Sequence, residues 1–145
     1  MSRSRDVLGN GASRTATVGV RVPAQPDFLI VLRALAETVL LVSDLGLDEV
    51  DDVRVAVDEI ASTLIEVAAI GSSIECSFEV DNGRMTVCVT AVVTIRDTID
   101  ENGFGWNVIR TITDSIDAEI GSYDPRRCGY PVTVEFGRSF GTLGR

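Results

Sequence analysis

The stretch SIECSFEVDNGRMTVCVT, residues 73–90, decides the fold of this chain. Apolar and polar residues alternate on both sides of an Asn82-Gly83 pair, which is the pattern of two half-buried strands. Asn and Gly tolerate positive φ angles, so this pair is a strong signal for a tight hairpin turn. The sequence therefore predicts an antiparallel hairpin made of strands over 73–80 and 85–94.

A strand and two helices are expected before this hairpin. Residues 15–22 alternate between apolar and polar and predict the strand. The first helix is expected from near Pro26 to near Gly46, and the second over about 48–68. In both helices the apolar residues recur at intervals of three and four, so each has one apolar stripe to bury.

After the hairpin, the sequence predicts a third helix over about 106–118 and two short strands over 119–123 and 130–136. The element order is then β-α-α-β-β-α-β-β. Helices between hairpins favour an α/β (α+β) sandwich, with a mixed, mostly antiparallel sheet and three helices on one face.

The 145 residues suffice for one domain, which we expect to span residues 14–137. Residues 1–13 lack periodicity and predict a disordered tail, and residues 138–145 predict a flexible one. The N-terminal region has no apolar segment of the kind found in a signal peptide, and no apolar run is long enough to span a membrane. We therefore expect a cytoplasmic protein.

The formal net charge of −9 limits the choice of partners. A domain this acidic is repelled by phosphate backbones and by anionic membranes, so direct binding of nucleic acid or membrane is not expected. A basic protein surface is a better partner, because opposite charge speeds encounter.

The chain has no histidine, which excludes a Ser-His-Asp triad, a Cys-His pair and His-ligated zinc. Its three cysteines, Cys76, Cys88 and Cys128, are odd in number and widely spaced, which argues against a disulfide framework or a zinc site. A redox role for Cys128 stays open, because the neighbouring Arg126 and Arg127 are positively charged, and positive charge lowers the pKa of a thiol.

Within the second predicted helix, VAVDEIAST at 55–63 places Glu59 and Thr63 four residues apart, on one helix face. This segment resembles the N-box of the Bergerat-fold, histidine-kinase-like ATPase domain, in the form found in anti-sigma serine kinases of the RsbW/SpoIIAB type. The resemblance implies that Glu59 is the catalytic base. It also implies that Thr63, which stands where the family has a magnesium-binding Asn, is a possible Mg²⁺ ligand.

Two more segments carry the resemblance, which covers about residues 15–137. GFGWNVI at 103–109 resembles the second glycine box of the family. The resemblance implies that Gly103, Gly105 and Trp106 contact a nucleotide, since glycines at a helix N-terminus let backbone N–H groups approach phosphates. GYPVTVEF at 129–136 resembles the closing strand and supports the fold alone.

The first glycine box of the family, D-x-G-x-G, has no counterpart here. Residues 89–95 read VTAVVTI and lack both the Asp that binds adenine and the two glycines. A hydrogen bond to a charged group contributes about 1.5–3 kcal/mol. The resemblance is therefore closest to the divergent actinobacterial, UsfX-like members of the family, and it implies a degenerate site at which ATP and magnesium binding is doubtful.

Taken together, these segments imply an anti-sigma factor that sequesters an alternative sigma factor of the stress or sporulation type. Within the family, an anti-anti-sigma factor releases the sigma factor, and the kinase domain forms a homodimer. Two alternatives stay open. In the first alternative, the chain is an active ATP-dependent serine kinase that acts on the anti-anti-sigma factor. In the second, it is a regulatory α/β module with no sigma partner.

Overall fold

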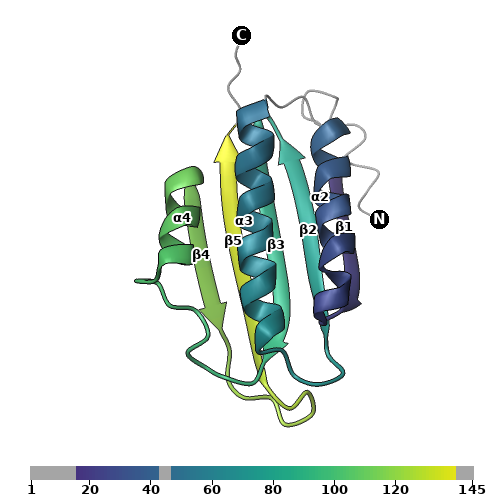
Figure 1. Cartoon of the computed structure of the whole chain (residues 1–145), viewed down its shortest axis with the longest axis vertical. Helices are drawn as coiled ribbons and strands as arrows, with labels where there is room; N and C mark the ends of the chain where they lie inside the picture. The colour runs from purple at the N-terminus through teal and green to yellow at the C-terminus, as the bar shows by residue number, and fades with distance from the viewer. Residues whose placement is uncertain (1–15, 43–46, 140–145) are drawn as a thin grey trace, which may run out of the picture.

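The computed structural model describes residues 16–42 and 47–139 of the chain. They form a five-stranded sheet in the order β1-β2-β3-β5-β4, with three helices against one face (Figure 1). Each neighbouring pair of strands in this sheet is antiparallel. The predicted α+β sandwich and its element order are thereby confirmed.

The central hairpin forms as predicted. Strand β2 (Ser73–Asp81) pairs with β3 (Arg84–Val93), and the register closes with Asp81 opposite Arg84. The two turn residues have positive φ angles, 48° at Asn82 and 76° at Gly83, which is the conformation that the Asn-Gly pair favours.

Strand β1 (Ala16–Pro23) and two helices precede the hairpin. The first helix begins as a 3-10 turn, η1 (Pro26–Phe28), and continues as α2 (Leu29–Val42). Its predicted end near Gly46 lies outside the described residues. Helix α3 (Leu47–Glu66) closely matches the predicted second helix and lies across the middle of the sheet (Figure 1). None of the helices in the described ranges combines the length and the apolar character that crossing a bilayer requires.

The prediction of a third helix over 106–118 is wrong at its C-terminal end. Helix α4 (Phe104–Ile112) stops at Ile112, and the following residues form strand β4 (Ser115–Ile120). This strand pairs with β5 (Tyr130–Ser139), and the inward residues alternate along it: Ile116, Ala118 and Ile120. Ile116 also continues the helical spacing of Ile109 and Ile112, so the pairing with β5 decides between the two periods.

Strand β5 also runs further than expected. The sequence predicts that the strand ends at 136 and that a tail begins at 138, yet Arg138 and Ser139 belong to β5. An ion pair anchors this end, because Arg138 Nη2 lies 2.9 Å from a carboxylate oxygen of Asp52 on α3. The predicted tail over 1–13, and the rest of the one predicted over 138–145, lie outside the described residues.

The core lies between the helices and the sheet. Its largest fully buried side chains come from α2, α3, α4 and the three middle strands, and include Leu32, Leu40, Leu64, Phe78, Met85, Ile109 and Phe136. The opposite face of the sheet carries mostly polar side chains, among them Arg21, Glu75, Ser77, Thr90 and Thr133, which alternate with the core residues along each strand. The described residues therefore leave this second face of the sheet open to solvent.

The three cysteines occupy different environments. Cys76 is buried, Cys88 is half-buried and Cys128 is exposed. Burial, with a smaller contribution from Cys88, raises the pKa of Cys76 to about 12, so this thiol stays protonated. Burial also raises the pKa of Cys88, helped by Glu135 and Glu75. Both strand cysteines are thus poor nucleophiles, as expected of small hydrophobic residues in a sheet.

Asp114, between α4 and β4, is expected to contribute to stability in a pH-dependent way. Burial alone would raise the pKa of Asp114. Hydrogen bonding with Ser139, whose backbone N–H donates at 2.6 Å, has the opposite effect, and so do the charges of Arg138 and Arg84. The net result is a pKa lowered from 3.8. The carboxylate therefore stabilises the fold fully above pH 3.8, and this contribution is lost as the pH falls through the lowered pKa.

The replacement Asp114→Asn is accordingly expected to cost about 1 kcal/mol at neutral pH, since the carboxylate is partly exposed. Urea unfolding of both proteins, at neutral pH and in acid below the lowered pKa, checks this. A difference that persists unchanged in acid would mean that the charge of Asp114 is not what stabilises the turn.

Candidate functional site

A cavity of about 180 Å³ lies between α3, the loop after β3 and the N-terminal turn of α4. It brings together all five residues that the sequence singles out: Glu59, Thr63, Gly103, Gly105 and Trp106. Its other lining residues are Ile60, Thr98, Ile99, Asp100 and Ile109. The predicted site residues thus share one concave place on the helix side of the molecule, although they come from segments some forty positions apart in the sequence.

Helix α3 presents Glu59 and Thr63 to this cavity one turn apart. Both are half-buried, at the edge of the apolar face of the helix. The Thr63 hydroxyl donates a hydrogen bond of 2.9 Å to the backbone carbonyl of Glu59. Its proton is therefore used within its own helix, and only the lone pairs of Oγ1 are available to a ligand.

The carboxylate of Glu59 lies against the start of α4. A Cβ atom placed on Gly105 would overlap the carboxylate oxygen of Glu59, and it would lie 2.8 Å from the carboxylate carbon. The glycine is what allows this close approach. The first N–H groups of a helix have no acceptor within the helix, and the helix dipole favours negative charge there. Glu59 thus brings its negative charge beside the first turn of α4.

A second carboxylate, that of Asp100, lies beside Gly103. A Cβ on Gly103 would be 3.0 Å from Asp100 Oδ2, while Asp100 Oδ1 accepts a hydrogen bond of 3.0 Å from the backbone N–H of Asn102. The Gly103 N–H donates to the carbonyl of Asp100 at 2.9 Å. Two acidic side chains therefore flank the two glycines, and none of the described residues that line the cavity is an arginine.

Asp100 was not identified from the sequence, and neither were Thr98 and Ile99 from the same loop. The signal available was an Asp three residues before the glycine pair. Such a residue can close a turn through its side chain, as Asp100 does here with Asn102.

Trp106 forms a wall of the cavity and is also part of the core. Only 7% of the residue is exposed, and its indole N–H has no hydrogen-bond partner among the described residues. The predicted nucleotide contact is therefore a residue whose apolar surface is largely buried by the protein itself.

Residues 89–95, which replace the first glycine box, contribute nothing to the cavity lining. The end of β3 is instead paired with the segment that follows α3. The N–H of Ala69 donates to the carbonyl of Val92 at 2.9 Å, and the N–H of Thr94 donates to that of Val67 at 2.8 Å. Val92 and Val93 are buried. The segment that stands where the family has its adenine-binding Asp is thus apolar, and its backbone is hydrogen-bonded to the segment after α3.

Comparison with known proteins gives a relative of named function. The chain is similar to the anti-sigma-F factor RsbW of Mycobacterium tuberculosis, in both strain CDC 1551 / Oshkosh and strain ATCC 25618 / H37Rv. In each case 27% of 99 aligned residues are identical, which covers 68% of this chain. The alignment spans 59% of the length of these relatives. No family model matches the chain.

The similarity covers most of the described fold and agrees with the resemblance that the 55–63 and 103–109 segments carry. The chain is therefore similar in sequence to RsbW-type anti-sigma factors.

Proposed function

We propose that this protein is a cytoplasmic anti-sigma factor that binds and sequesters an alternative sigma factor, and that its ATP site is degenerate. The observation that carries the proposal is the sequence similarity to proteins named anti-sigma-F factor. The net charge of −9 supports it, because the DNA-binding faces of sigma factors are basic. An anti-anti-sigma factor would release the sigma factor by competing for this chain.

The degenerate ATP site is supported by the contents of the helix-side cavity. Its volume of about 180 Å³ is below the range of about 300–1,000 Å³ that is typical of small-molecule sites. Asp100, which the family pattern does not call for, adds a second carboxylate beside the glycines, next to that of Glu59. The lining residues offer no positive charge to compensate, so the residues present do not fit a magnesium-bound triphosphate.

The loop before α4 supports the same proposal. A nucleotide-binding domain needs a lid that opens and closes over its ligand, whereas a binding module needs only a compact connection. Residues 94–103 are closed by local hydrogen bonds, from Thr98 Oγ1 to the carbonyl of Ile95 at 2.5 Å and from the Asn102 N–H to Asp100 at 3.0 Å. This arrangement is that of a compact connection.

The decisive experiment is direct binding of the purified chain to the alternative sigma factors of its own cells, with and without ATP and magnesium. We expect one sigma factor to bind equally well in both conditions. Failure to bind any of them would contradict the anti-sigma role. Binding that requires nucleotide would leave that role standing but contradict the degenerate site.

Removing the two carboxylates is expected to improve nucleotide binding. Wild-type protein should bind ATP–magnesium only weakly, with a Kd above about 1 mM. In the double variant Glu59→Gln, Asp100→Asn, the loss of two like charges should lower the Kd about tenfold. Calorimetric titration measures both values, and Asp97→Asn, an exposed loop carboxylate that does not line the cavity, is the matched control.

The second candidate function is an active serine kinase, favoured by the gathering of Glu59, Thr63 and the two glycines in one cavity. In that case Glu59→Gln would abolish transfer of labelled phosphate to an anti-anti-sigma protein. If wild-type protein transfers phosphate and this variant does not, the kinase replaces the degenerate site as the better account.

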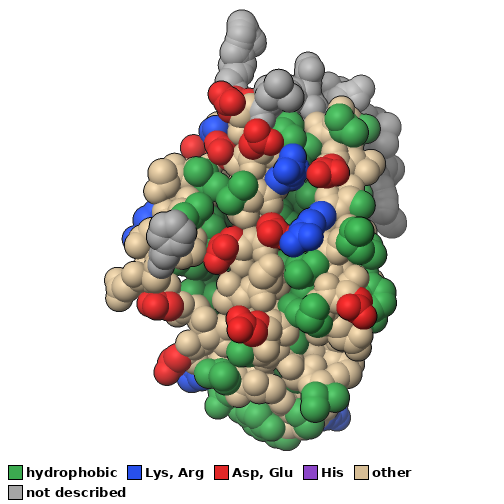
Figure 2. Space-filling view, viewed as in Figure 1, with side chains coloured by type: hydrophobic (Ala, Val, Ile, Leu, Met, Phe, Trp, Pro, Cys, Tyr) green, Lys and Arg blue, Asp and Glu red, His purple; other side chains and the backbone are tan. Residues whose placement is uncertain are grey.

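A homodimer is also part of the proposal, supported by the outer surface of α2. Four large apolar side chains on this helix are exposed, and three of them strongly: Ile30 at 68%, Leu41 at 83% and Val42 at 81%. Val31 extends the surface along the helix. Figure 2 shows hydrophobic side chains along this side of the molecule, and Val18 of the edge strand β1 is exposed nearby. Such a patch, beside an unpaired strand edge, is typical of a subunit interface.

A further inference from the structure

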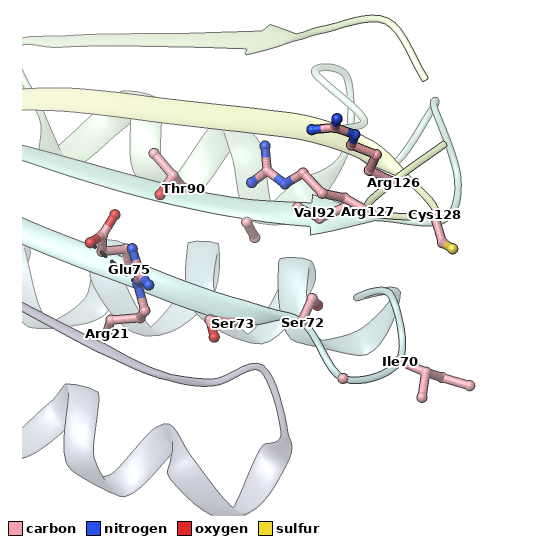
Figure 3. A pocket seen from close by; sticks show the side chains of 12 residues that line it. Arg21, Ile70, Ser72, Ser73, Glu75, Thr90, Val92, Arg126, Arg127 and Cys128 are labelled. Atoms are coloured by element: carbon pink, nitrogen blue, oxygen red, sulfur yellow. Dashed lines mark ion pairs between the residues drawn. The ribbon is translucent and has the colours of Figure 1, made fainter. Parts of the chain in front are cut away.

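The open face of the sheet carries a groove of about 440 Å³ that is unrelated to the helix-side cavity. One wall comes from β1 and β2, and the other comes from β3 and the turn between β4 and β5 (Figure 3). The turn at Gly71 and Ser72 closes one end. None of its lining residues lines the helix-side cavity.

The groove is basic, although the protein as a whole is acidic. Three arginines line it, Arg21, Arg126 and Arg127, against a single carboxylate, Glu75. Arg21 and Glu75 form a loose ion pair, with Nε and Oε2 3.6 Å apart. Among the described residues, Arg126 and Arg127 have no carboxylate within ion-pair distance. The groove thus keeps two uncompensated positive charges.

The turn holds both of these arginines in place. The side chain of Asp124 accepts a hydrogen bond of 3.0 Å from the Arg126 N–H, and its carbonyl accepts one of 3.1 Å from the Arg127 N–H. Gly129 fixes the end of the turn against β3, since a Cβ there would lie 2.6 Å from the carbonyl oxygen of Val93. Figure 3 shows both guanidinium groups extending back from the turn over the strands, toward Thr90.

The remaining lining offers hydroxyl groups. Ser72 donates its hydroxyl to the carbonyl of Ala69. The hydroxyls of Ser73 and Thr90, which line the same groove, have no hydrogen-bond partner among the described residues. Arginine side chains bind phosphate with two parallel hydrogen bonds, and serine and threonine hydroxyls suit sugar hydroxyls. A volume of about 440 Å³ exceeds what a bare phosphate ion needs and lies in the range of small-ligand sites.

We propose that this groove binds a small phosphate monoester with a hydroxylated body, such as a sugar phosphate or a nucleoside monophosphate. The phosphate lies between Arg126 and Arg127, and the body extends over Thr90 toward Ser73 and Glu75. A polyanion such as nucleic acid is disfavoured, because the rest of this acidic protein repels it.

The test uses ribose 5-phosphate as the probe, and ribose and inorganic phosphate, its two halves, as controls. Binding is measured from the shifts of backbone amide signals of the full chain in nuclear magnetic resonance spectra. Ribose 5-phosphate should shift the Gly71 and Gly129 signals saturably, phosphate should shift them more weakly, and ribose should not shift them. The Gly105 signal, at the helix-side cavity, should stay in place. The absence of saturable shifts at roughly 10 mM probe would overturn the proposal.

Matched charge variants complete the test. The pair Arg126→Gln, Arg127→Gln should weaken binding about tenfold or more, whereas the pair Arg54→Gln, Arg110→Gln, the same charge change on α3 and α4, should leave it unchanged. Equal loss in both variants would mean non-specific attraction and would overturn the site. A phosphoserine peptide that binds more tightly than ribose 5-phosphate would overturn the assignment to a small molecule. Thermal unfolding of each variant checks that these exposed substitutions leave the fold intact.

Discussion

Replacing Ile30 and Leu41 by glutamate is expected to make the proposed dimer monomeric. Burial of one large apolar side chain contributes about 1.5–3 kcal/mol, so loss of two should weaken association by at least about 100-fold. Both side chains are exposed on α2 in the single chain, so the substitutions should leave its own stability almost unchanged. Sedimentation velocity over a range of protein concentrations measures the effect.

A control is available, because Ile70 is fully exposed in the turn after α3 and is not part of α2. Ile70→Glu should leave the association state as it is in the wild-type protein. If the wild-type chain is monomeric at the highest concentration measured, the dimer proposal is wrong. If the double variant still associates, the dimer forms through a different surface.

The second large effect is expected for Trp106→Ala, which should lower the free energy of unfolding by about 3–5 kcal/mol. This residue is 7% exposed and packs into the core through α4. A loss of that size is a large part of the roughly 5–15 kcal/mol that stabilises a typical domain. Urea unfolding followed by circular dichroism measures it, since the variant lacks the only tryptophan of the chain.

Trp106→Phe separates packing from hydrogen bonding at this position. Phenylalanine keeps an aromatic ring in the core and removes an N–H group that has no partner among the described residues. The expected cost is therefore only about 1 kcal/mol. If Trp106→Ala also costs only about 1 kcal/mol, the indole does not support the core, and ligand binding becomes the better explanation for this residue.

The elements that could be predicted from the sequence are those with local causes. The 73–94 hairpin depends on an alternating pattern and on the Asn82-Gly83 turn, which are both contained in one short stretch. The end of α4 depends on a strand pairing with β5, and the sequence of residues 115–118 fits either a helix or a strand. Long-range pairing therefore overrides a local pattern that was ambiguous.

The candidate site shows the same division. The resemblance to a known family was sufficient to select Glu59, Thr63, Gly103, Gly105 and Trp106, which share one cavity. It gave no indication that the Glu59 carboxylate lies against Gly105, because that contact depends on how α3 packs on α4. The arginine groove was likewise not predicted. Arg21 and Arg127 line the same groove only because the strands between them pair into one sheet.

The order of strands in the sheet also has a consequence for how the chain folds in time. The β2–β3 hairpin joins neighbouring segments, whereas Val20 must find Cys76 and Val89 must find Val134 across long intervening stretches. Closing such loops costs entropy before any contact is gained. We expect the hairpin to form early and β1 and β5 to dock on it late, with overall folding in milliseconds to seconds rather than microseconds. Until β1 docks, the edge of β2 is unpaired, so the interval before docking is when aggregation competes with folding.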